Sequence, residues 1–453
     1  MKLFLKCLCI VLILALLTAG AAAEVTLNTV FQYMPVIQTV SGTSYVIVES
    51  KKDNTRGLYT TDGQEIIPCT TVYLDYLSND FFNAYNEKDS IDARALWTGD
   101  GRMVTEAKYG AFKIFNNHWV AAFVVNPEPQ AEKEFQDVRI GSSSYKYEQI
   151  DLFYVTDEQT EGIAPLATLD RDAYSGASIH GDYIAITNRE NAISVYDSHF
   201  QPITVELSAN NKPLYKVDKY QIISLIDKKM LGDGYTEVAE VNLSDRMLVK
   251  GTRVALNGTK LSSLMNPDGT VVLPADYAII DVTDRYALVA DLEGQQGLYD
   301  LNEGRFIVPC AYTAIVSSKT DADKYVHNGY VCVEKDERLG FYDTVNDMES
   351  CAPKYSKYAV TNIGCSLIFT SIEGYLTIVA GDGEVNVVDA DVIVATRGNG
   401  YLLEAKKGAS FGLVDWHGNL ILPMYHYKEI TVTDDSNAII RTSTGLQLDQ
   451  IIR

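Results

Sequence analysis

Six histidines could act as metal ligands or general bases, because a neutral imidazole binds metals and titrates near neutral pH. None of them shows the HExxH spacing of a zinc helix or another ligand pattern. His417 occupies a position that Asp62 and Asp268 hold elsewhere in the chain, so we expect it to serve a hairpin turn. His426 lies between two tyrosines and could face a central opening, but a packed aromatic role is favoured. The six are His118, His180, His199, His327, His417 and His426.

The nucleophile patterns of hydrolases are missing from the sequence. No GxSxG occurs, and the Gly-Ala-Ser segment at 408–410 precedes an expected strand. Cys69 and Cys310 each follow a strand proline with no histidine nearby, which indicates a repeated structural position. A glycosidase needs two carboxyls about 5 to 10 Å apart, but among 60 acidic residues some pair meets this distance by number alone. We therefore predict no catalytic residue, and no Walker A or Rossmann glycine pattern predicts a cofactor.

Calcium is the metal that the acidic loops favour most. The loops Asp321–Asp323, Asp389–Asp391 and Asp434–Asn437 offer the oxygen ligands that calcium prefers. None of them matches the DxDxDG calcium loop. Solvated loops are therefore expected, with calcium as the weaker alternative.

Residues 1–23 have the pattern of a secretory signal peptide. A positively charged start precedes an apolar run from Cys7 to Leu17 and the small residues Ala19–Ala23. No later segment has about 18 consecutive apolar residues, the number that a membrane-spanning helix requires. We expect residues 24–453 to form a secreted, extracytoplasmic repeat domain with no integral membrane segment.

The remaining chain is strongly acidic. The formal charge is −22, which becomes −24 when the two lysines of the signal peptide are removed. Such a field repels phosphate backbones and anionic lipid surfaces, so no nucleic-acid partner is expected. A solvated acidic surface explains the charge better than an organised cation site.

Five cysteines follow the signal peptide, and an odd number at irregular spacing is not a disulfide framework. Cys310 could pair with Cys332, or Cys351 with Cys365, and buried free thiols on strands are equally expected. The fifth is Cys69.

Internal repetition is the best signal in the chain. The segment Gly57–Cys69 recurs as Gly412–Pro423, as Gly297–Cys310 with one extra residue in the turn, and as Ser263–Pro274. Each copy predicts a short apolar strand, a tight turn whose glycine takes a positive φ, and a second apolar strand. The proline cannot donate to a ladder, so it should end that strand or lie at an edge or bulge. The structural residues of the repeat are Gly57, Gly63, Pro68, Gly269, Pro274, Gly297, Gly304, Pro309, Gly412, Gly418 and Pro423.

Two further strands are expected after each proline, as in Tyr277–Val282 and Tyr286–Ala290. A four-stranded meander of about 40 residues is the blade size of a β-propeller. The predicted fold is therefore an all-β, propeller-like array of such meanders. Two smaller propellers or an open β-solenoid stay as alternatives, because the number of copies exceeds the usual blade number. With the weaker and fainter copies included, units open near 57, 95, 153, 193, 263, 297, 340, 376 and 412.

Two regions of the array carry more specific expectations. Met34–Glu49 and Gly445–Ile452 resemble two halves of one unit, so pairing of the chain ends could close the array. Asn126–Gln149 fits the period poorly, and its prolines and charges predict an exposed insertion loop. The period is also poor over Lys228–Gly251.

The repeated motif resembles the WG repeat of bacterial proteins. In that family a tryptophan or tyrosine commonly precedes the opening glycine, whereas this chain has Arg56, Gln296, Leu339 and Phe411 there. The resemblance implies binding or scaffolding modules and brings no catalytic residue to any position of this chain.

The function predicted from the sequence is a non-catalytic extracytoplasmic binding or scaffolding protein that recognises a protein, peptide or glycan. Its many tyrosines favour this role, since tyrosine offers a large contact area and a hydroxyl. Two alternatives remain: an extracytoplasmic hydrolase or lyase that uses carboxylates, and a structural envelope protein.

Overall fold

The computed structural model describes residues 36–39, 45–50, 52–60, 64–87, 90–129, 138–140, 143–157, 162–205, 214–318, 324–397, 402–425, 429–432, 437–441 and 446–450. The expected signal peptide, Gly63, His426, the loop 321–323 and residues 434–436 lie outside this part of the chain.

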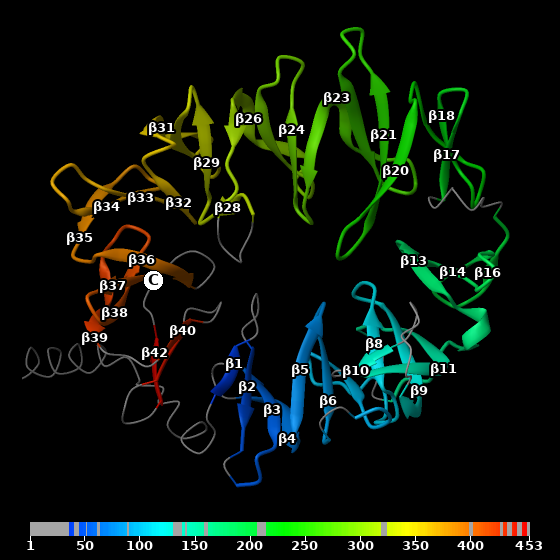
Figure 1. The fold of residues 1–453 in the computed structure, drawn as a ribbon. Coiled ribbons are helices and arrows are strands. Elements are labelled where there is room, and N and C mark those ends of the chain that lie inside the picture. The colour runs from blue at the N-terminus through cyan, green and yellow to red at the C-terminus, as the bar shows by residue number, and fades with distance from the viewer. Residues whose placement is uncertain are drawn as a thin grey trace, which may run out of the picture.

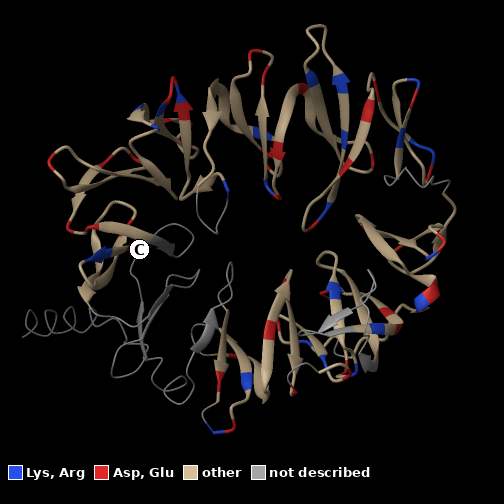
Figure 2. Cartoon of the chain, in the orientation of Figure 1, with Lys and Arg blue, Asp and Glu red and all other residues tan. Residues whose placement is uncertain are grey.

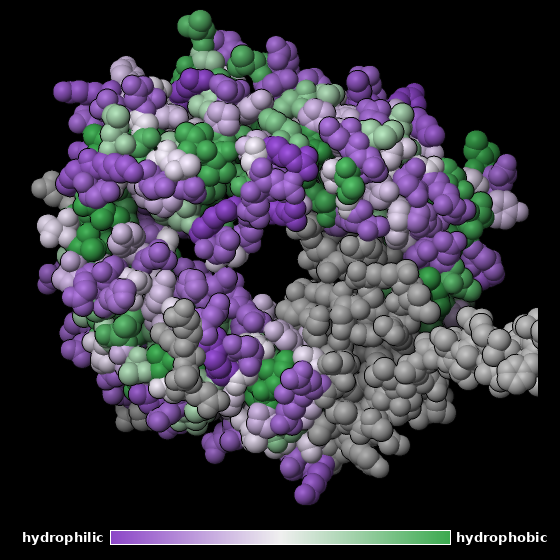
Figure 3. All heavy atoms as spheres, turned by 180° about the vertical axis from the view of Figure 1, so that it is seen from behind, coloured by the Kyte–Doolittle hydropathy of each residue, from purple (hydrophilic) through white to green (hydrophobic). Residues whose placement is uncertain are grey.

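The protein is an all-β array of small antiparallel sheets, as predicted. Its sheets follow one another around a ring, from the blue N-terminal strands to the red C-terminal strands (Figure 1). Seen from behind, the ring surrounds an opening whose visible rim is mostly hydrophilic where the residues are described (Figure 3). The charged residues lie mainly on the loops and along individual strands (Figure 2).

The first five sheets cover residues 36–233. A short 3-10 turn, Arg171–Ala173, lies between the third and the fourth. In chain order the sheets contain β1 (Val36–Thr39), β2 (Tyr45–Glu49), β3 (Arg56–Thr60) and β4 (Glu65–Thr71); β5 (Tyr73–Ser78), β6 (Phe81–Tyr85) and β7 (Ala95–Thr98); β8 (Ala111–Ile114), β9 (Trp119–Pro129), β10 (Val138–Ile140), β11 (Ser143–Tyr154) and β12 (Ala167–Asp170); β13 (Gly176–His180), β14 (Tyr183–Thr187), β15 (Ile193–Tyr196) and β16 (Pro202–Ile203); and β17 (Tyr215–Asp218), β18 (Gln221–Ser224) and β19 (Met230–Asp233).

The second half of the chain continues the pattern. A seven-stranded sheet contains two four-stranded meanders that share β23. The strands are β20 (Glu237–Asn242), β21 (Met247–Val254), β22 (Lys260–Met265), β23 (Val271–Val282), β24 (Tyr286–Ala290), β25 (Gln296–Asp300) and β26 (Arg305–Tyr312); β27 (Ala314–Ile315), β28 (Val326–His327), β29 (Tyr330–Lys335), β30 (Arg338–Asp343) and β31 (Met348–Ser356); β32 (Thr361–Ile363), β33 (Ser366–Thr370), β34 (Leu376–Ala380) and β35 (Val385–Val388); β36 (Val392–Arg397), β37 (Leu402–Lys407), β38 (Ser410–Asp415) and β39 (Leu420–Tyr425); and β40 (Glu429–Val432), β41 (Asn437–Arg441) and β42 (Leu446–Gln450).

The sheet boundary differs from the predicted one by two strands. The glycine strand and the proline strand, such as β25 and β26, are the third and fourth strands of their meander. The sequence predicts that the end of β23 and β24 complete the preceding unit. Instead, the end of β23 pairs with β24, and β24 pairs with the next glycine strand, β25. Sequence periodicity gives the length of a repeat but not its starting strand, because every neighbouring pair is joined by a similar hairpin.

The chain ends lie in two sheets. Strand β1 pairs with β2, whereas β42 pairs with β41, and no described strand pair joins β42 to β1. Figure 1 shows the C-terminal sheet next to the N-terminal sheet in the ring. Among the described strands, the expected pairing of the two ends is therefore not found.

The sequence predicts an exposed insertion loop over Asn126–Gln149, but both ends of this segment are strands, so the prediction is wrong there. Strand β9 runs to Pro129, which lies opposite Tyr145 of β11. The register shifts between Tyr145 and Tyr147, so Pro127 falls where the ladder is already interrupted. A proline is tolerated at such a bulge because the missing N–H breaks no regular pair.

A β-bulge explains the proline of each repeat. From Gln296 to Leu298 the glycine strand advances by two residues while its partner advances by four, from Tyr312 to Val308. Similar shifts occur where β3 meets β4, β22 meets β23 and β38 meets β39. The prolines inside these bulges are Pro68, Pro274, Pro309 and Pro423.

The opening glycine is required because the bulged strand passes very close to it. A Cβ on Gly297 would lie 2.8 Å from Cys310 Sγ and 2.9 Å from Val308 O. The corresponding distances to a backbone oxygen are 2.6 Å at Gly57 and 2.5 Å at Gly412. No side chain fits at these distances without a shift of the backbone.

The residues after the glycine complete the unit. Leu58, Leu298 and Leu413 are completely buried, and Leu58 and Leu298 belong to apolar clusters of the ring. The aspartate that ends the motif holds the following turn. Asp300 Oδ1 accepts the backbone N–H groups of Asn302 at 2.8 Å and Glu303 at 2.9 Å.

The turn glycines have a left-handed backbone. Gly269, Gly304 and Gly418 have φ values of 90°, 67° and 95°. The N–H of Gly269 donates to Asn266 O, and Asn266 N–H donates to Thr270 O, which closes the hairpin. Only glycine adopts this conformation without a steric penalty.

We predict that Gly297→Ala destabilises the protein by about 1–3 kcal/mol, the usual cost of forcing an extra methyl into packed structure. The new Cβ would overlap Cys310 and Val308. Thermal unfolding should show a lower Tm. Gly176→Ala is the matched control, since no atom lies within 4 Å of its ideal Cβ; equal Tm values for the two variants would contradict the bulge argument.

A second prediction concerns the stability of the protein at low pH. Burial alone would raise the pKa of Asp300, but hydrogen bonds from the Glu303 N–H and the Arg285 guanidinium outweigh it and lower the pKa. The stabilisation is therefore complete above the unfolded pKa of about 3.9 and is lost as the pH falls through the lower folded pKa. We expect Asp300→Asn to reduce Tm at pH 7 and to shrink the further loss of Tm below pH 4. Asp157→Asn, which changes a fully exposed carboxyl, should do neither.

Candidate functional site

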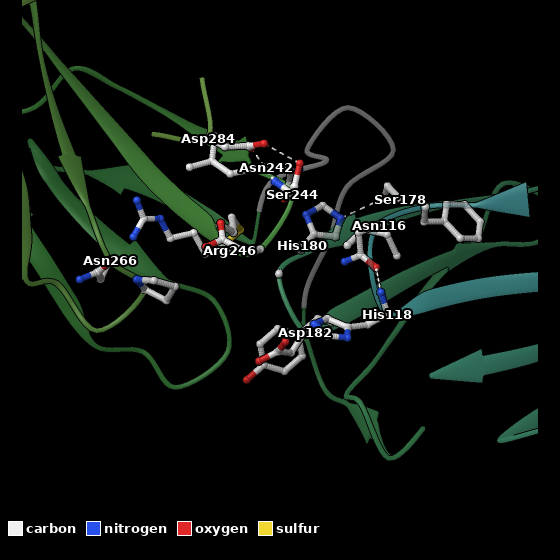
Figure 4. A pocket seen from close by; sticks show the side chains of 18 of the residues that line it. Asn116, His118, Ser178, His180, Asp182, Asn242, Ser244, Arg246, Asn266 and Asp284 are labelled. Atoms are coloured by element: carbon white, nitrogen blue, oxygen red, sulfur yellow. Dashed lines mark hydrogen bonds between the residues drawn. The ribbon is translucent and has the colours of Figure 1, made fainter. Parts of the chain in front are cut away.

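A pocket of about 990 Å³ lies among the loops of several sheets. It is lined by the loops that join the first and second strands of neighbouring sheets, including the β13–β14 and β20–β21 loops, and by the β22–β23 turn (Figure 4). The labelled lining residues are mostly polar: Asn116, His118, Ser178, His180, Asp182, Asn242, Ser244, Arg246, Asn266 and Asp284. Tyr183, Tyr215 and Phe115 add aromatic surface.

Ser178 and His180 line the pocket, and both belong to a hydrogen-bonded series that ends at Glu240, outside the lining. The Ser178 hydroxyl lies 2.9 Å from His180 Nε2, and His180 Nδ1 is hydrogen-bonded to Glu240 Oε2. The other carboxylate oxygen of Glu240 accepts the backbone N–H of Leu214 at 2.6 Å. His180 comes from β13 and Glu240 from β20, so the contact joins two sheets and the segment that precedes β17.

His118 is held by the scaffold on the same side of the pocket as Ser178 and His180 (Figure 4). Its Nδ1 lies 2.8 Å from the carbonyl oxygen of Val155, and its ring packs near Tyr154. Asn116 Oδ1 accepts the N–H groups of His118 and Trp119. The loop is therefore fixed by its own hydrogen bonds.

The remaining polar lining is also ordered by hydrogen bonds. Asp284 accepts both the N–H and the hydroxyl of Ser244, at 2.8 and 2.7 Å. Arg246 donates to Asn302 Oδ1 at 2.7 Å. Hydrogen bonds from the Thr270 N–H and hydroxyl lower the pKa of Asp268, so this carboxyl is ionised at neutral pH.

A second cluster lies between two hairpin turns elsewhere in the ring. Asp382 and Glu384 follow β34, and His417 lies in the β38–β39 turn; one donor atom of each lies within 4.8 Å of the other two. His417 Nε2 is 2.8 Å from Asp382 Oδ2, and Asn386 donates to the far oxygen of Glu384. One imidazole and two carboxylates suit zinc or a similar transition metal better than calcium, which prefers oxygen ligands throughout.

The five described cysteines are free. Cys69 and Cys310 lie in the bulges beside Gly57 and Gly297, the matched positions that the repeat indicates. Burial raises the pKa of Cys310 to about 11, so very little thiolate exists at neutral pH. This environment argues against a cysteine nucleophile at that position.

The pocket residues were not singled out by sequence reasoning. Of the repeat copies quoted above, only the turn of Ser263–Pro274 reaches the pocket, through Asn266, Pro267 and Asp268. His118 and His180 appeared only among the scattered histidines. Ser178 and His180 alternate along one strand and so share a face, which a pattern search can find. Glu240 lies 60 residues further along the chain, and only the ring brings it to His180.

Comparisons with known proteins give no family for this chain. No protein-family model matches it, and no curated protein matches it. Solved structures with some likeness include a eukaryotic initiation factor, with 9% identity over 85% of this chain and 97% of that chain, at a TM-score of 0.34. BamB from Moraxella catarrhalis has 10% identity over 83% and 95% of the two chains, at a TM-score of 0.21. Likeness at this level indicates nothing about activity.

Among the described residues, no helix is long and apolar enough to cross a membrane.

We predict that Glu240→Ala destabilises the fold by about 3 kcal/mol, because the buried His180 and the Leu214 N–H both lose their acceptor. The Glu240 side chain is only 7% exposed. Glu237→Ala on the same strand removes an exposed pair with Lys260 and should cost less than about 1 kcal/mol. Thermal unfolding of both variants measures the difference, and similar losses would show that the Glu240 contact stabilises little.

Proposed function

We propose that this chain is an extracytoplasmic binding or scaffolding protein of the WG-repeat type, and that its pocket takes a hydrophilic ligand, foremost a glycan. The observation that carries the proposal is the pocket itself, with its polar side chains held in place by backbone hydrogen bonds. Ordered donors and acceptors lose little entropy when a ligand binds.

The chemistry of the lining favours a neutral sugar over other ligands. Amide, hydroxyl and carboxylate groups match the hydroxyls of a saccharide, and Tyr183 and Phe115 offer aromatic surface. Asp182, Asp245 and Asp284 make the pocket acidic, so an anionic ligand is disfavoured. A peptide would use the same polar groups but would also need apolar pockets for its side chains.

A carboxylate-dependent hydrolase has less support. Such an enzyme needs a carboxyl whose pKa is raised so that it can act as a general acid. The pocket carboxyl Asp268 has its pKa lowered instead.

The experiment is a glycan array with the mature protein, followed by calorimetry with the best ligand. Arg246→Ala should weaken binding roughly tenfold or more, the usual cost of one hydrogen bond to a charged group. Arg253→Ala is the control, because this arginine follows on β21, donates to the exposed Asp276 and lies outside the pocket lining. No glycan binding, or equal losses for both variants, would contradict the proposal, and a parallel peptide array would then identify a peptide ligand.

A further inference from the structure

Ser178 and His180 on the pocket wall, with Glu240 next to His180, have the connectivity of a nucleophile, its base and the group that orients the base. Ser178 and His180 are two residues apart on β13, so their side chains leave the same face of the strand. The Ser178 hydroxyl is 2.9 Å from His180 Nε2, and Glu240 is hydrogen-bonded to Nδ1 on the far side of the imidazole. Figure 4 shows the Ser178–His180 bond at the pocket.

The hydrogen bonds define the tautomer of His180. An ionised carboxylate only accepts hydrogen bonds, and Glu240 already accepts the Leu214 N–H with its other oxygen. Glu240 therefore receives the proton on His180 Nδ1. The Nε2 atom keeps its lone pair and can accept the proton of the Ser178 hydroxyl.

Burial separates the three groups by role. His180 is 3% exposed and the Glu240 side chain 7%, so both are fixed inside the structure. Ser178 is partly exposed and lines the pocket. A clamp between sheets needs only the histidine and the glutamate, whereas the serine extends the chain of hydrogen bonds to the ligand space.

We propose that this site hydrolyses oxygen esters carried by the pocket's ligand, such as an O-acyl group on a neutral sugar. The inference goes beyond the binding role and would replace the non-catalytic function predicted from the sequence. It uses the pocket of the proposed function to hold the substrate, with the acyl group at Ser178.

The reaction balances with water as the only co-reactant. Ser178 Oγ bonds to the ester carbonyl carbon while its proton passes to His180 Nε2. The bond from that carbon to the sugar oxygen then breaks, and this oxygen takes the proton from His180 to leave as the alcohol. Water, deprotonated by His180, attacks the acyl-serine, and the acid leaves while Ser178 regains its proton. Glu240 holds the imidazole in the required tautomer and stabilises its protonated form.

The lining favours neutral esters. Asp182, Asp245 and Asp284 repel an anionic substrate, and the amide groups of Asn116 and Asn242 line the same pocket as donors for a carbonyl oxygen. A neutral ester carries no charge at its acyl group, so the substrate needs no cationic partner there.

The first experiment treats the mature protein with a fluorophosphonate probe and locates the modified residue by mass spectrometry. Wild type should be labelled at Ser178, and Ser178→Ala should lose the label. Ser175→Ala is the matched control, because Ser175 just precedes the same strand but its hydroxyl donates to Asn188 O at 2.8 Å and it lies outside the pocket lining. It should be labelled like wild type.

The second experiment measures hydrolysis of p-nitrophenyl acetate. Ser178→Ala should reduce kcat/KM by about 10²-fold or more while its Tm stays within a degree of wild type, since the Glu240 contact is intact. Glu240→Gln should lower kcat more than it raises KM. An unlabelled wild type, or hydrolysis that survives in Ser178→Ala, would overturn the inference; glycan binding that persists in such a protein would leave the binding function standing.

Discussion

Much of the remaining structure depends on the close approach of the bulged fourth strand to the glycine of the third strand. The third strand of a sheet carries a glycine where the fourth strand bulges toward it, and a Cβ at Gly297 would meet Cys310 and Val308 below 3 Å. The bulge in turn accepts the proline, whose missing N–H would interrupt a regular ladder. Glycine and proline are thus two halves of one steric arrangement, and each explains why the other recurs at its position.

This arrangement bends the fourth strand so that it leads into the next sheet. Strand β23 shows the result most directly, because it is the last strand of one meander and the first of the next. The apolar clusters contain residues of neighbouring sheets, such as Leu298 of β25 with Val331 of β29. A single sheet could not bury its own apolar faces, so each one depends on its neighbours, as in other repeat folds.

The pocket lies among loops outside the repeated motif. The motif occupies the third and fourth strands, whereas the pocket is lined mainly by the loops between first and second strands. The same rigid sheets hold the Ser178–His180–Glu240 set, which links β13 to β20. Residues that define the fold and residues that line the pocket are therefore largely separate in this protein.

The sequence by itself determined the all-β class, the short antiparallel strands and the repeat length, because these depend on local alternation, turn glycines and spacing. It also marked Gly57, Gly297 and Gly412 as special positions, although the reason lies in a partner strand. Tertiary structure alone decided which strand begins each sheet, that Pro127 lies within a strand, and that the two ends belong to separate sheets. It alone also placed Glu240 beside His180, since a contact across 60 residues depends on how the sheets follow one another around the ring, and no local pattern encodes that geometry.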